Sequence, residues 1–153
     1  MSDQYTMFSI GPWWTRLSRA EQSTFINYLK VLCARKLITD ANKAAFVENV
    51  CLRVLDPEEG NGEINQSAIA DLTAVYGYSA GMVLIVTKHL FDQFMTPISA
   101  KEAARLMNID MRNIDDIRAL CRKGTLTAHK NPRGHWLITP ASVINHIMPN
   151  RWL

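Results

Sequence analysis

The sequence predicts a mainly α-helical protein with one small β-hairpin near its C-terminal end. Apolar residues recur at the three- and four-residue spacing of a helix face through much of the chain. Two Ser-x-x-Glu capping boxes, at Ser18 and Ser99, mark helix starts. Two short stretches that can form strands, 126–130 and 135–138, flank the turn-forming sequence Asn-Pro-Arg-Gly at 131–134, which is typical of a hairpin. We therefore expect an N-terminal helical bundle over 1–96 and a small helix-and-hairpin domain over 97–153.

The N-terminal bundle is expected to contain four or five helices. Helical spacing of apolar residues covers four stretches, 18–37, 40–54, 66–76 and 79–95. The segment 56–63 is rich in acids and glycine, so it is expected to form a surface loop. The bundle should end at Met95-Thr96-Pro97, because proline disfavours a helical residue before it.

The stretch 79–90 is apolar almost all round. Such a helix belongs in a core or in a subunit interface. The region 66–90 can also be aligned to a helix-turn-helix, but its second helix offers almost no charge to phosphates. We therefore expect a homodimer that is held by the helical half, with the interface residues Met82, Val83, Ile85, Val86 and Leu90.

The C-terminal third has closely spaced start and stop signals. The Ser99 capping box opens a short helix that ends at Asn108, a residue type that tolerates the left-handed conformation. Asp110 can cap a second helix, which Gly124 ends. One face of this helix carries the apolar residues Ile114, Ile117 and Cys121.

The hairpin and the last helix follow directly. We expect strands over 126–130 and 135–138, with His129 and His135 facing each other across the hairpin. Thr139 and Pro140 supply an N-cap and a first-turn proline for the last helix. The predicted order is therefore helix, turn, helix, hairpin, helix.

Charge is distributed unevenly between the two parts. Residues 97–153 carry nine Lys and Arg against four Asp and Glu, a formal charge of +5, and the preceding residues carry −2. A basic segment joined to a mildly acidic one indicates that one part meets a polyanion and the other meets protein.

The stretch 98–147 resembles the winged helix-turn-helix of the excisionase and MerR families. This resemblance implies binding to double-stranded DNA, with the second helix in the major groove and the hairpin as a wing against the backbone. Arg112 and Asn113 would read base edges, and basic side chains near them would bind phosphates. The expected DNA-binding residues are Lys101, Arg112, Asn113, Asp116, Lys123, Lys130, Arg133 and His135.

Two aspartates depart from the usual pattern of these families. Asp115 and Asp116 place negative charge on the helix that would face DNA. Asp116 lies one turn beyond Arg112 and is expected to pair with it. An acid can also accept a hydrogen bond from cytosine, so base reading by Asp116 stays open.

Other chemistry is not indicated. The three cysteines have no metal-type spacing and fit reduced thiols of a cytoplasmic protein, and the four histidines share no metal-type spacing either. The sequence lacks a nucleophile elbow, a phosphate-cradling glycine loop and a nuclease-like carboxylate cluster on one face, so neither an enzyme nor a cofactor is expected. No signal peptide is expected, and the apolar run 82–86 is too short to cross a bilayer. The tryptophans are expected to be core and terminal anchors.

Two functions from different classes fit these features. The first is a DNA-binding regulator of prokaryotic, phage or plasmid type that acts through its C-terminal domain. The second is a non-enzymatic interaction protein, such as a phage-encoded inhibitor or assembly adaptor, that binds a host protein through the helical half. The acidic segment 56–63, the two aspartates and the apolar helix at 79–90 fit the second function.

Overall fold

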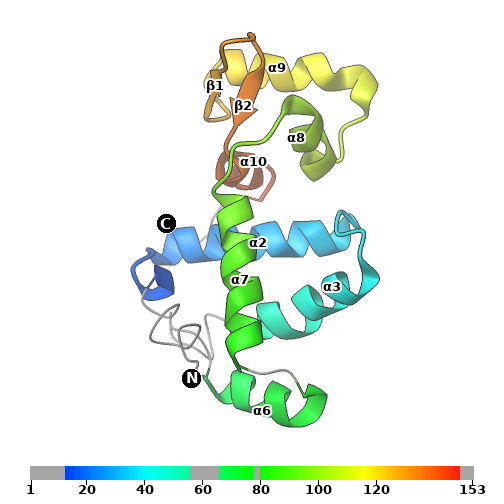
Figure 1. Ribbon diagram of the computed structural model, residues 1–153. Helices are drawn as coiled ribbons and strands as arrows, with labels where there is room; N and C mark the ends of the chain where they lie inside the picture. Colours follow the sequence, from blue (N-terminus) through cyan, green and yellow to red (C-terminus); the bar gives the residue numbers. More distant parts are fainter. Residues whose placement is uncertain (1–12, 56–65, 78–79, 149–153) are drawn as a thin grey trace.

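The computed structural model describes residues 13–55, 66–77 and 80–148, and it shows a mainly helical chain with one small antiparallel sheet near its C-terminal end (Figure 1). The N-terminal elements are α2 (Arg19–Ala34), α3 (Ala41–Phe46), the π-helix η2 (Val47–Cys51), α4 (Leu52–Val54), α6 (Gln66–Tyr76) and α7 (Ala80–Phe94). The C-terminal elements are α8 (Ala100–Met107), the 3-10 turn η3 (Met111–Asn113), α9 (Ile114–Arg122), β1 (Ala128–Lys130), β2 (Trp136–Ile138) and α10 (Pro140–Ile147). The predicted loop 56–63, Ser79 and Trp152 lie outside the described residues.

Helix starts in the N-terminal part follow the capping signals of the sequence. Ser18 Oγ accepts a hydrogen bond from Glu21 N at 3.1 Å, and Ser18 N donates to Glu21 Oε1 at 2.8 Å, which confirms the first capping box. The Asp40 carboxylate accepts from the backbone N–H groups of Asn42 and Lys43. The helical run that begins there is wound as a π-helix over Val47–Cys51, which the helical spacing did not predict.

An aromatic cluster fills the N-terminal core where α2 and α7 cross. The Phe25 ring of α2 lies 5.3 Å from the Phe91 ring and 5.4 Å from the Phe94 ring of α7, centroid to centroid. Trp14 is buried against Phe25, and Trp13 stacks on Phe91. These two tryptophans are therefore core anchors, as predicted.

The N-terminal and C-terminal parts share one continuous hydrophobic core. Helix α10 packs against α2, and Thr24 Oγ1 lies 3.0 Å from Asn145 Oδ1 across that contact. Ile98, just after the predicted boundary, pairs with Ile138 of β2 through backbone hydrogen bonds of 2.7 and 2.8 Å. The division at residue 97 stays a prediction, but the two parts are packed together rather than joined by a free linker.

The predicted dimer interface on α7 needs a correction. Val83 and Leu90 are 0% and 1% exposed within the single chain, because they fill the core where α7 meets the other helices. They are therefore core residues rather than surface residues. Val86 is half-buried, whereas Met82 and Ile85 are 38% and 41% exposed.

Candidate nucleic-acid interface

A short turn joins α8 to α9. Ser99 caps α8 through its hydroxyl, which accepts from Glu102 N at 3.2 Å. Asn108 then adopts the left-handed conformation (φ 56°, ψ 42°), and Ile109 N donates to the Ala104 carbonyl at 2.9 Å. This C-cap was predicted from the sequence and reverses the chain tightly enough for α8 and α9 to pack together.

The left-handed conformation of Asn108 leads to a prediction about the stability of the protein. Replacing Asn108 with Ala should lower the free energy of unfolding by about 1 kcal/mol, because a Cβ without a compensating polar group is disfavoured at φ 56°. Replacing Asn108 with Gly should leave stability unchanged or slightly higher. Urea denaturation of the two variants beside the wild type measures this, and equal losses in both would contradict it.

Arg112 lies in the 3-10 turn before α9, and its ionic partner differs from the one predicted. Its Nη2 lies 3.0 Å from Asp110 Oδ2, and Asp110 Oδ1 also accepts from Arg112 N at 2.9 Å. These hydrogen bonds hold the pKa of Asp110 below its usual range. The predicted pair with Asp116 was wrong, because the α-helix begins only at Ile114 and the four-residue helical spacing does not extend back to Arg112.

Helix α9 buries one face and exposes the other. Ile117 and Cys121 are buried and Ile114 is half-buried, as the apolar spacing predicted. On the exposed face, Arg118 Nη1 lies 2.7 Å from Asp115 Oδ1. Asp116 is exposed and has no ion pair among residues 13–55, 66–77 and 80–148. Gly124 follows α9 and has φ 77°, a left-handed conformation that lets the chain turn toward β1.

The hairpin is held by its turn. Asn131 Oδ1 accepts from Arg133 N and from His135 N, both at 3.0 Å, and Gly134 takes φ 82°. Lys130 Nζ lies 5.2 Å from the centre of the Trp136 ring, a cation–π contact across the strands. The register pairs His129 with Leu137, so the prediction that His129 faces His135 was wrong.

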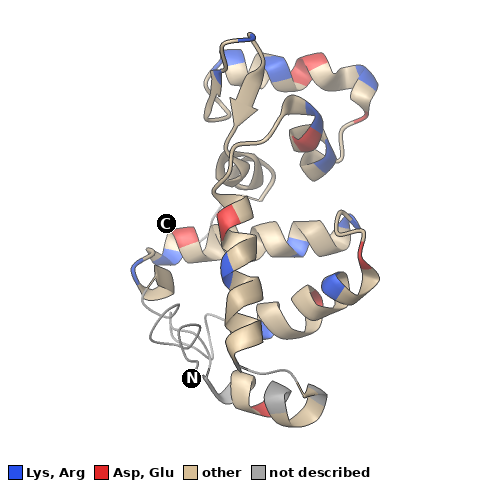
Figure 2. Ribbon diagram, viewed as in Figure 1, with Lys and Arg blue, Asp and Glu red and all other residues tan. Residues whose placement is uncertain are grey.

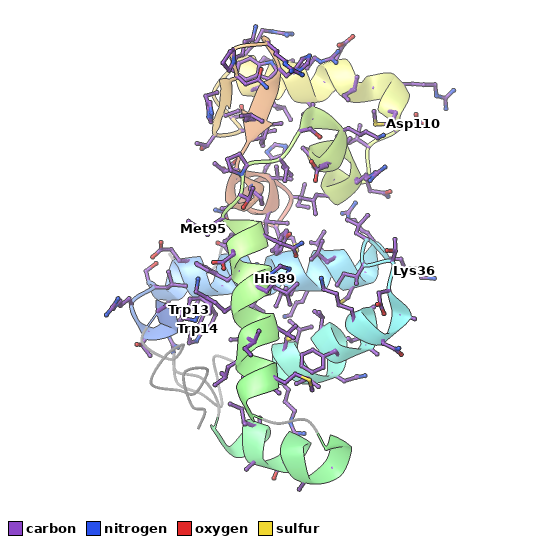
Figure 3. The ribbon with its side chains drawn as sticks, in the orientation of Figure 1. Trp13, Trp14, Lys36, His89, Met95 and Asp110 are labelled. Carbon is purple, nitrogen blue, oxygen red and sulfur yellow. The ribbon has the colours of Figure 1, made fainter. Side chains whose placement is uncertain are left out.

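The eight predicted DNA-binding residues are all exposed, but they do not form one cluster. Figure 3 places Asp110, the partner of Arg112, at the end of α9 that is remote from the hairpin. Helix α9 has nine residues and is therefore about 14 Å long. Arg112 and Asn113 therefore mark one end of a surface strip along α9, and the hairpin marks the other.

Charge pairing leaves this strip basic. Three carboxylates of the C-terminal part are engaged: Glu102 bonds Ser99, Asp110 pairs with Arg112, and Asp115 pairs with Arg118. Among residues 98–148, five cationic side chains have neither an ion pair nor a cation–π contact: Lys101 and Arg105 on α8, Arg122 and Lys123 at the end of α9, and Arg133 in the hairpin. Figure 2 shows Lys and Arg on the hairpin and along α9, with acidic residues between them. The surface can therefore attract a polyanion.

Arg118 and Arg122 belong to this strip but were not among the predicted residues. Arg118 and Arg122 lie on the flanks of α9 rather than directly opposite Ile114, Ile117 and Cys121, so their exposure depends on which elements pack beside the helix.

No protein-family model, curated protein or solved structure was found to match this chain. No helix of the described residues is long and apolar enough to cross a membrane. Over those same ranges, no group of three or more His, Cys, Asp or Glu side chains is placed to hold a metal ion.

Proposed function

We propose that residues 98–147 form a winged helix-turn-helix and that the chain is a non-enzymatic, double-stranded-DNA-binding regulator of prokaryotic, phage or plasmid type. The observation that carries this proposal is the surplus of cations without an ion pair on α8, α9 and the hairpin. The order of α8, left-handed turn, α9, hairpin and α10 supports the same assignment. The short pairing of Ile98 with Ile138 adds a third extended segment beside the hairpin.

In this proposal α9 enters the major groove and the hairpin lies against the backbone beside it. Lys123 at the end of α9 and Lys130 and Arg133 in the hairpin bind phosphates, which supply affinity without sequence choice. Arg112 and Asn113 are placed at the far end of α9 to reach base edges. The Arg112 side chain is 88% exposed, so it can leave Asp110 for a base or a phosphate.

The test is a titration of the full-length protein with random-sequence duplex DNA at several salt concentrations, followed by fluorescence anisotropy. A full-length chain is needed because α10 packs against α2. Counterion release predicts that the logarithm of the binding constant falls linearly with the logarithm of salt concentration, by about 0.9 per phosphate contact. Binding that is absent or insensitive to salt would contradict the proposal.

Asp110 should restrain DNA binding, because it holds the Arg112 guanidinium. We expect Asp110→Asn to tighten binding to random duplex by about two- to fivefold, since a solvent-exposed ion pair holds the Arg112 guanidinium only weakly. Asparagine is also a good N-cap, so the 3-10 turn should persist. Anisotropy at low salt measures the change.

The matched control for Asp110→Asn is Asp71→Asn. Asp71 lies on α6 and pairs with Arg53 at 3.1 Å, so this variant also removes one exposed acid and releases one arginine. Equal tightening by both variants would mean that net charge, and not the position of Arg112, governs binding.

A second candidate function is protein binding through the exposed face of α7. Met82 and Ile85 are large apolar side chains that stay more than a third exposed on this helix. A homodimer through them would give the regulator two DNA-binding units. Light scattering of the wild type and of Ile85→Glu tests this: a dimer that the variant converts to a monomer supports it, and a monomeric wild type contradicts it.

A further inference from the structure

A cleft of about 520 Å³ lies where the N-terminal helices meet α8. Its walls come from four segments: α2, the connection 37–43, α7 and the stretch from Ile98 through α8. This volume lies within the range of small-molecule sites in proteins. The cleft is separate from the DNA-binding strip, which lies on α9 and the hairpin.

Six aliphatic side chains line the inner part of the cleft, and polar groups make up the larger share of its accessible lining. Leu32, Leu90 and Leu106 come from three different helices, and Leu37, Ile38 and Ile98 complete the wall. Leu90 and Leu106 are buried, so the helices that carry them hold this wall in place. Such a surface fits an aliphatic or aromatic group of a ligand.

The polar rim carries charges of both signs, but they are not equally available. The Asp40 carboxylate accepts from Asn42 N and Lys43 N at 2.9 and 3.1 Å, as the cap of α3. The Glu102 carboxylate accepts from Ser99 N and Ser99 Oγ at 3.3 and 3.2 Å, as part of the cap of α8. One oxygen of each acid on the rim, Asp40 Oδ1 and Glu102 Oε1, is therefore engaged in a helix cap.

The two bases on the rim are not held in this way. Lys43 and Arg105 line the cleft from the N-terminal and C-terminal parts, and neither side chain has a hydrogen bond or an ion pair among the described residues. Tyr28 lies at the cleft, and burial together with the Glu102 charge raises the pKa of its hydroxyl, which keeps that group a proton donor. The rim therefore offers two cations and a phenol donor, beside two carboxylates that each have one oxygen in a helix cap.

We propose that this cleft binds a small organic anion, a carboxylate on an apolar aliphatic or aromatic body, with Lys43 and Arg105 on the carboxylate and the leucine-rich wall on the body. Because the walls come from both parts of the chain, such a ligand holds α8 against α2 and α7. It therefore stabilises the folded chain by RT ln(1 + L/Kd), where L is the free ligand concentration. This site does not depend on the proposed DNA binding and is tested without DNA.

Three probes of the same shape test the proposal on the full chain: phenylpropionate, phenylpropanol and phenylpropylamine. Amide chemical shifts from NMR titrations show where each probe binds, and thermal unfolding gives the shift in Tm. We expect phenylpropionate to bind saturably, with shifts clustered at 37–43, Gln93 and α8, and to raise Tm. The alcohol should bind at least tenfold more weakly and the amine more weakly still.

Single-residue variants distinguish anion binding in the cleft from anion binding elsewhere on the protein surface. Lys43→Gln and Arg105→Gln should each weaken phenylpropionate binding by about tenfold, the usual scale of one lost charge-assisted hydrogen bond. Arg122→Gln removes an exposed arginine of α9, which does not line the cleft, and should leave binding unchanged. No saturable binding at millimolar phenylpropionate, equal binding of all three probes, or equal weakening by Arg122→Gln would each overturn the proposal.

Discussion

Replacing Lys123, Lys130 and Arg133 together with glutamine will weaken binding to random duplex DNA by about two to three orders of magnitude at about 0.1 M salt. Each phosphate contact contributes about 0.9 to the slope of log binding constant against log salt, so losing three contacts makes the slope shallower by about 2.7. All three side chains are exposed, so the fold should be retained. Anisotropy titrations at several salt concentrations give both quantities.

The control for this variant removes the same charge from the N-terminal part. Arg16, Lys30 and Lys36 are exposed there, and Figure 3 places Lys36 close to the end of α2, away from the hairpin. Replacing these three residues with glutamine should change the salt slope by much less than one unit. Equal effects from the two triple variants would mean that DNA does not contact the strip on α9 and the hairpin.

The largest stability effect is expected at Ile117. Its side chain is fully buried on the inner face of α9, so Ile117→Ala should lower the free energy of unfolding by about 2–5 kcal/mol. The neighbouring exposed residue is the control: Asp116→Ala should change stability by less than about 0.5 kcal/mol. Urea denaturation measures both variants. A small loss at Ile117 would mean that α9 is not packed through this face.

Local signals in the sequence predicted the ends of the elements well. The capping boxes at Ser18 and Ser99, the left-handed Asn108 and the Thr139-Pro140 start of α10 are all confirmed. Each of these features depends on a few neighbouring residues, because a cap is made within one turn of the helix end. The hairpin was predicted for the same reason, since its turn residues are adjacent in sequence.

Features that depend on distant residues were not predicted. The burial of Val83 and Leu90 within one chain depends on helices that pack on α7 from elsewhere in the sequence. The pairing of Ile98 with Ile138 joins residues that are 40 positions apart. The cleft at α8 depends on four separate segments. The partner of Arg112 was missed because the 3-10 turn shifted the start of α9.

The contact between α2 and α10 also has a consequence for synthesis of the chain on the ribosome. Thr24 and Asn145 lie 121 positions apart, and a ribosome adds roughly 5–20 residues per second. About 6–24 seconds therefore pass between synthesis of the α2 face and synthesis of the α10 residues that cover it. During that interval α2 presents uncovered surface to solvent, where a holdase chaperone or a neighbouring nascent chain can bind it. Completion of the last helix, rather than of the N-terminal bundle, ends this exposure.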